Sequence, residues 1–326
     1  MNNATERNDC YSNLSGILKE NDKITSKDLA GRIIFLSQTV IGVLGNFLLL
    51  LYYSFIFQHG RKVRLTDVFL KQLFIANSLV LLSGGVPQTM VAFRLQYLFN
   101  DTACKCLLYI DGVGRGMSIG TICLLSVFQN IIISPINSCW KDVKGKAQEY
   151  IGFSIRYCWI LNILTNLIVR LYAWYSSVNG FDRIIKKKVD IGYCCLVDYG
   201  VAIGSIYTAL VTFPEVCFSL LIVWSSGSMI FNLYRHKQNV QHIHMSSTFL
   251  KSPESRATQS ILCLVGTFIT FYTVSTIIRI FITLAYSVSL WLVSVSDVIA
   301  LCFPTVSPFL IMSLYSSKHW HCFSCT

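Results

Sequence analysis

The chain has 326 residues, of which 53% are hydrophobic and 13% charged, and its mean hydropathy is +0.55. A chain this apolar cannot cover its surface with polar groups in water, and the same figures exclude disorder, collagen, coiled coils and small disulfide scaffolds. The net charge of +11 would suggest a nucleic-acid partner in a soluble protein, but here basic residues flank apolar segments, where anionic lipids attract them. The composition therefore predicts a protein of the lipid bilayer that does not bind nucleic acid.

Seven apolar runs follow one another along the chain, and each can cross a hydrocarbon core, which takes about 20 helical residues. None alternates with period two, which argues against an outer-membrane barrel. Because only helices satisfy the backbone of such segments in lipid, we predict an all-α membrane protein, a seven-transmembrane-helix bundle. The predicted helices cover about residues 33–57, 68–93, 107–133, 151–173, 202–234, 257–286 and 290–314 of a receptor domain at 33–315.

Prolines and glycines interrupt several of these runs. Neighbouring helices can satisfy the backbone groups that a proline frees, so the prolines at 87, 214, 304 and 308 do not argue against spanning helices. Gly112, Gly116 and Gly120 recur every fourth residue and therefore share one face of the third helix. We expect a neighbouring helix to approach closely there, because the spacing does not fit a phosphate-binding loop.

The polar residues 1–32 are predicted to be extracellular, and residues 316–326 to form a short cytoplasmic tail. With this orientation the inner and outer segments carry equal numbers of lysine and arginine, so charge does not decide the topology. Three Asn-x-Ser/Thr sequons fall on the outer side, at Asn3, Asn13 and Asn100, and favour it. They are candidate glycosylation sites of a multi-pass plasma-membrane protein.

Seven helices with an external amino terminus describe a G-protein-coupled receptor, and local motifs sharpen the match. They lie in helices 1, 2, 3, 6 and 7 and in the inner loops. The motifs are Gly42-Val43-Leu44-Gly45-Asn46, Leu65-Thr66-Asp67, Ala76-Asn77-Ser78-Leu79, Gly112-Val113-Gly114-Arg115-Gly116, Ser134-Pro135-Ile136-Asn137-Ser138, Tyr234-Arg235-His236-Lys237, Arg256-Ala257-Thr258-Gln259-Ser260 and Phe303-Pro304-Thr305-Val306-Ser307-Pro308. Together they resemble the vomeronasal type-1 receptors over about residues 33–315.

The resemblance implies a chemosensory receptor of the pheromone type. Such a receptor binds a small semiochemical in the outer half of the bundle and activates an inhibitory-type heterotrimeric G protein, without enzymatic activity, cofactor or metal. The alternatives are a membrane transporter with a midplane substrate site, which would show paired halves, and a bitter-taste-type receptor. Whether the receptor pairs with another copy is left open.

The chain departs from general rhodopsin-like receptors in ways that the vomeronasal family shares. No Asp-Arg-Tyr triplet closes helix 3, where Val127-Phe128-Gln129-Asn130 stands. Asn77 takes the place of an acidic sodium-site residue, and Ser307-Pro308 replaces the usual Asn-Pro of helix 7. The usual activation switches therefore cannot be transferred to this chain.

The resemblance also pairs Cys104, just before helix 3, with Cys194 in the second outer loop. Such a disulfide would tie the loop over the mouth of the bundle in an oxidising compartment. Cys106 and Cys195 are neighbouring thiols that provide an alternative pairing.

Charged residues within the spans are candidates for the ligand site, because intramembrane charges are costly and usually functional. Asp111 stands four residues before Arg115, so the two can pair along the helix, or Asp111 can meet a ligand ammonium group. Glu215, Arg279 and Asp297 are further candidates, although Glu215 can also be a polar group bonded within the bundle.

Basic residues cap the inner ends of the predicted helices. We expect them to form the face that meets the G protein, and the simpler alternative is lipid anchoring alone. They are Arg61, Lys62, Lys141, Lys144, Arg235 and Lys237.

Overall fold

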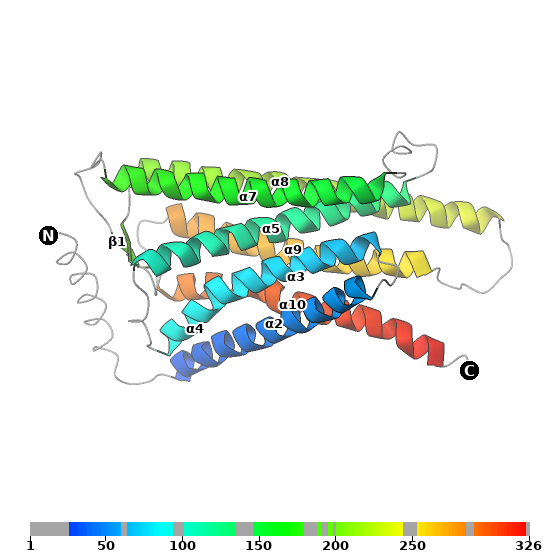
Figure 1. Ribbon diagram of the computed structural model, residues 1–326, viewed down its shortest axis with the longest axis horizontal. Helices are drawn as coiled ribbons and strands as arrows, with labels where there is room; N and C mark the ends of the chain where they lie inside the picture. Colours follow the sequence, from blue (N-terminus) through cyan, green and yellow to red (C-terminus); the bar gives the residue numbers. More distant parts are fainter. Residues whose placement is uncertain are drawn as a thin grey trace.

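The computed structural model describes residues 26–59, 64–93, 101–134, 146–178, 188–190, 195–197, 200–243, 253–284 and 290–323. Within these ranges seven helices are long and apolar enough to cross a membrane, which confirms the predicted bundle. The helices lie side by side along the long axis of the molecule (Figure 1). The start of α2 (Ser26–Gln58) and the end of α10 (Leu290–Phe323) lie at opposite ends, as an odd number of crossings requires.

The second span consists of three consecutive pieces, α3 (Leu65–Val80), a π-helical segment (Leu81–Gly85) and α4 (Val86–Ala92). The remaining spans are α5 (Asp101–Ile133), α7 (Ala147–Val178), α8 (Gly200–Ile243) and α9 (Pro253–Leu284). Two short antiparallel strands, β1 (Lys188–Asp190) and β2 (Cys195–Val197), pair between α7 and α8 and were not predicted. Figure 1 places β1 at the end of the bundle where α2 begins.

The prolines are accommodated in two different ways. Pro87 has no N–H to donate to the carbonyl of residue 83, and the π-helical segment, which has a wider turn, lies directly before it. Pro308 likewise leaves the carbonyl of Pro304 without its usual donor, and the side-chain amide of Asn46 on α2 donates to that carbonyl at 2.8 Å. A neighbouring helix therefore satisfies the freed group, as the sequence analysis expected of a bundle.

Helix α5 lies at the centre of the bundle. It packs against α3, α7 and α8, and 67% of its apolar window is buried, against 17% for α7 and α8. Aromatic contacts join its inner half to the adjacent spans, for example Phe69 with Phe128 at a centroid distance of 5.5 Å. These contacts make α5 the framework for any site inside the bundle.

The glycine stripe of α5 packs against α7, as the spacing predicted. A Cβ atom added at Gly112 or Gly116 would overlap the side-chain amide oxygen of Asn166 or Asn162, and one added at Gly120 would overlap the thiol of Cys158. The asparagines direct their NH₂ groups back to carbonyls of α7 itself at 2.9 Å. The stripe therefore allows polar side chains of α7 to lie directly on the α5 backbone.

We predict that Gly116→Ala destabilises the receptor by about 1–3 kcal/mol, because the added methyl group must displace Asn162 or separate the two helices. The thermal midpoint of the detergent-solubilised protein measures the loss. Gly266→Ala is the matched control, since nothing lies within 4 Å of a Cβ added there. Asn162→Ala combined with Gly116→Ala should restore part of the stability, and an unchanged midpoint in Gly116→Ala alone would contradict the assignment.

Candidate functional site

An ion pair lies on α5 in the region where ligand contact was predicted. Arg115 Nε lies 2.7 Å from Asp111 Oδ2, one helical turn away, and the two side chains are 17% and 15% exposed. Of the two predicted alternatives for Asp111, this structure contains the local pair. Since both groups are largely shielded from solvent, each charge depends on the other for compensation.

The second oxygen of the Asp111 carboxylate lies against the π-helical segment of the second span. This Oδ1 atom is buried and accepts no hydrogen bond from the part of the chain that the structure describes. A Cβ added at Gly84 would come within 3.1 Å of it. Gly84 therefore provides the space that the carboxylate occupies.

Helix α10 brings a second carboxylate to the same region. Asp297 Oδ2 accepts a hydrogen bond from Gln88 Nε2 at 2.7 Å, and Asp297 also interacts electrostatically with Arg115. Asp111 is thus the ion-pair partner of Arg115 among the described residues, and Asp297 places a second carboxylate in the same region. Gln88 was missed in the sequence, because an uncharged amide within an apolar run gives no sign of what it will contact.

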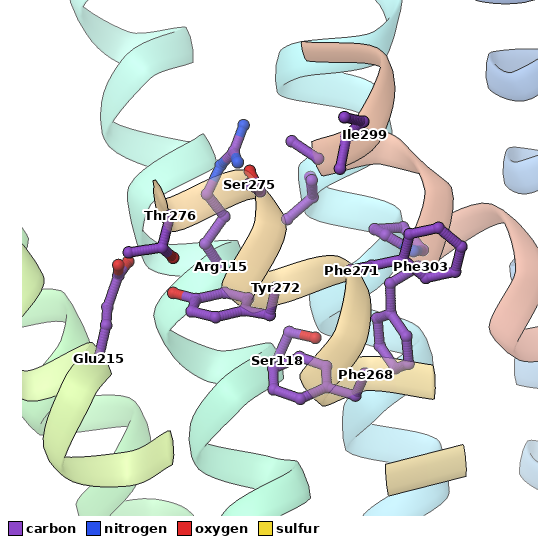
Figure 2. Close-up of a pocket in the computed structure, with 13 residues that line it drawn as sticks. Arg115, Ser118, Glu215, Phe268, Phe271, Tyr272, Ser275, Thr276, Ile299 and Phe303 are labelled. Atoms are coloured by element: carbon purple, nitrogen blue, oxygen red, sulfur yellow. The ribbon is translucent and has the colours of Figure 1, made fainter. Parts of the chain in front are cut away.

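A cavity lies near the middle of the bundle, beside this charged cluster. Its volume is about 490 Å³ including its open side, and its walls come mainly from α5, α8, α9 and α10. Arg115 and Glu215, two of the predicted ligand-site residues, line it together (Figure 2). The other aromatic and hydroxyl-bearing residues of the wall are Ser118, Phe268, Phe271, Tyr272, Ser275, Thr276 and Phe303.

The aromatic wall was not identified from the sequence. Phe268 stacks on Tyr272 at a centroid distance of 5.1 Å and meets Phe303 edge-on at 4.8 Å. Phe268 and Tyr272 are one turn apart on α9, which was the only available signal. Because the chain has 21 phenylalanines and 16 tyrosines, that spacing alone does not separate a cavity wall from the core.

Glu215 on α8 also lines the cavity. Its side chain is half-buried, and its carboxylate makes no hydrogen bond or ion pair with the described residues. Figure 2 shows the carboxylate pointing toward Thr276 of α9. Of the two predicted alternatives for Glu215, the described residues provide no bonded partner within the bundle.

A chain of hydrogen bonds leads from the cavity into the core. Ser118, in the cavity wall, donates to Asn77 Oδ1 at 3.1 Å, and Asn77 Nδ2 donates to Ser307 Oγ at 2.8 Å. All three side chains are buried, and they come from α5, α3 and α10. Asn77, which replaces an acidic residue of related bundles, thus links three helices without carrying a charge.

A similar amide contact joins α5 and α8 near their inner ends. Asn232 Nδ2 donates to Asn130 Oδ1 at 3.4 Å, about one helical turn before Arg235. Arg235 itself is exposed. Among the basic residues predicted for the inner face, the structure describes the side chain of Arg235 alone. The side chains of the other five residues lie outside the described part of the chain: Arg61, Lys62, Lys141, Lys144 and Lys237.

Other predicted sites fall wholly or partly outside the described residues. Cys104 is buried at the outer end of α5 and is disulfide-bonded, while Cys106 is a free thiol. Cys194 and the sequon residues Asn3, Asn13 and Asn100 lie outside the description, as does the side chain of Arg279. Among the side chains that are described, no group of three or more potential metal ligands is found.

We predict that Asp111→Asn impairs folding, because it leaves the shielded Arg115 guanidinium without its nearest counter-charge. The expected loss is about 3 kcal/mol, as for other broken buried pairs. Cell-surface expression and the thermal midpoint of the solubilised protein both report it.

The double variant Asp111→Asn with Arg115→Gln removes both charges and should recover much of that loss. If Asp111→Asn alone reaches the surface at the wild-type level and unfolds at the wild-type temperature, the structural importance of the pair is refuted.

Comparisons with known proteins agree on one family. The family model described as the vomeronasal organ pheromone receptor family matches residues 29–321. The chain is 45% identical to vomeronasal type-1 receptor 2 of Homo sapiens over 291 residues, 89% of this chain and 73% of that protein. It is 43% identical to vomeronasal type-1 receptor 4 of Pongo pygmaeus over 290 residues, with coverages of 89% and 95%.

A longer match extends the likeness almost to the full chain. Vomeronasal type-1 receptor 1 of Homo sapiens is 39% identical over 324 residues, 97% of this chain and 90% of that protein. The relatives are receptors and not enzymes, and together with the seven apolar helices they support a multi-pass membrane protein, consistent with the plasma membrane. The family inferred from the motifs is thereby confirmed: the chain belongs to the vomeronasal organ pheromone receptor family, that of the vomeronasal type-1 receptors.

Proposed function

We propose that this chemosensory receptor binds its semiochemical in the cavity between α5, α8, α9 and α10 and activates an inhibitory-type heterotrimeric G protein. The family implies a small-molecule ligand and G-protein signalling in general. The observation that carries the proposed location is the cavity itself, which combines an aromatic wall with Arg115 and Glu215. Apolar walls with a few polar groups are typical of small-molecule sites.

The proposed mechanism uses the contacts around the cavity. A ligand there touches α9 through Tyr272 and Phe268 and α10 through Phe303, and α9 packs mainly against α10 and α8. A ligand can shift the helix arrangement only by binding one arrangement better than another. We propose that the preferred arrangement repositions α8 and α9 and that the bonds from Ser118 through Asn77 to Ser307 carry the change toward the inner half of α10.

The proposal is tested by nucleotide exchange on purified heterotrimers of different classes, with receptor-containing membranes and a panel of volatile and steroid-like compounds. Agonist-dependent exchange on the inhibitory class is the expected result. Exchange on another class alone would refute the proposed coupling, and ligand uptake independent of any G protein would support a transporter instead.

The inner basic residues are proposed to contact the G protein. Lys141→Gln with Lys144→Gln should lower agonist-stimulated exchange several-fold while cell-surface expression changes less, because neutral side chains weaken electrostatic complementarity at the interface. Lys105→Gln, an exposed lysine at the opposite end of α5, is the matched control. An equal loss of expression and exchange would favour lipid anchoring alone.

The pairing of Cys104 with Cys194 is a further proposal, supported by the disulfide-bonded state of Cys104. Cys104→Ser and Cys194→Ser should each reduce surface expression or ligand response, because the second outer loop loses its covalent tether. Peptide mapping under non-reducing conditions checks the partner. Recovery of a peptide that joins Cys104 to Cys195 would overturn the pairing.

A further inference from the structure

The charges around the cavity are distributed unevenly. Arg115 is compensated by Asp111 at 2.7 Å and interacts in addition with Asp297 from α10. Glu215 contributes a third carboxylate, and its oxygen atoms contact no positive group among the described residues. One guanidinium thus faces three carboxylates: Asp111 forms an ion pair with it, Asp297 accepts a hydrogen bond from Gln88, and Glu215 has neither kind of partner among the described residues.

A partly buried, ionised carboxylate is stabilised by a positive charge or by hydrogen-bond donors beside it. Thr276 lies on the facing helix and offers one hydroxyl group (Figure 2). A hydroxyl group can donate a single hydrogen bond, so it cannot compensate a full charge. A cation that enters the cavity can supply the charge compensation that the described side chains do not.

From this balance we infer that Glu215 is the anchor for a protonated amine, and that the ligands of this receptor are small molecules with one basic nitrogen and an apolar ring. The inference rests on the proposed ligand site and assigns its chemistry. The ring has a matching surface, because Phe268, Tyr272 and Phe303 form a continuous aromatic wall. Aromatic faces also attract a nearby ammonium group.

The ion pair on α5 also favours Glu215 over Asp111 as the carboxylate that binds the amine. The sequence analysis named Asp111 as a possible partner for a ligand ammonium group, but its charge is compensated by a partner on the same helix. Binding an amine at Asp111 would release Arg115, whereas binding at Glu215 breaks no interaction of the described structure. An anionic ligand is disfavoured for the converse reason, because Arg115 is occupied and Glu215 would repel it.

The test uses the full-length receptor in lipid nanodiscs without G protein and measures its thermal midpoint. The probes are 2-phenylethylamine and 2-phenylethanol, with cyclohexyl and naphthyl analogues of both, because each amine differs from its alcohol only in the charged group. Amines should bind the wild type about ten- to a hundredfold more tightly than the matched alcohols, as expected for a charge-assisted hydrogen bond.

Glu215→Gln should abolish this preference, and Glu215→Asp, which keeps the charge, should retain part of it. Glu149→Gln, an exposed acid at the start of α7, is the control and should bind as the wild type does. Equal binding of amines and alcohols by the wild type, no stabilisation by any amine, or an unchanged preference in Glu215→Gln would each overturn the inference. Amine binding without agonist-dependent nucleotide exchange would leave this site standing and refute the proposed signalling.

Discussion

Every polar group inside the hydrocarbon layer must find its partner within the chain, because lipid offers neither donors nor acceptors. Many polar side chains in the interior of this receptor follow that constraint. Asn46 donates to the carbonyl that Pro308 leaves open, and Asn77 joins Ser118 to Ser307. The hydroxyl groups of many serines and threonines bond to carbonyls of their own helices, as Thr270 does to Gly266. Among the described residues the constraint is incompletely met at Asp111 Oδ1 and the Glu215 carboxylate, near the candidate ligand site, and also at Gln38 Oε1, Asn46 Oδ1, Ser225 Oγ and Ser226 Oγ.

The same constraint separates the two surfaces of each helix. Large apolar side chains such as Phe47 and Leu48 of α2 are more than half exposed and face outward, where lipid replaces water as their surroundings. Small and polar residues gather between helices, since lipid gives apolar side chains no reason to prefer the interior. The contact of Gly116 with Asn162 is one product of this arrangement, because the missing side chain lets an amide lie on a neighbouring backbone.

Local properties of the chain could be predicted from the sequence, and contacts between distant segments could not. Hydropathy indicated the seven helices because each must cross the same thickness of lipid. The pairing of Asp111 with Arg115 was a predicted alternative because both residues lie on one helix at a spacing of four. By contrast, the contact of Gln88 with Asp297 depends on the rotation of two helices about their own axes, which no local pattern specifies. The cavity was inaccessible to sequence reasoning for the same reason: Glu215, Arg115 and Tyr272 come from three helices.

The π-helical segment at Leu81–Gly85 inserts, in effect, one residue into the second span. Each residue of an α-helix advances the side chains by about 100° around its axis, so α4 is rotated by that amount relative to an uninterrupted α3. This rotation is what turns Gln88 toward Asp297 and Thr89 toward Thr39 of α2. The loss of a single codon in this stretch would restore a regular helix and carry both side chains around toward the lipid. In a receptor lineage, the deletion of one residue here would therefore turn Gln88 and Thr89 away from the interior of the outer bundle in one step. Neither residue would have to be substituted.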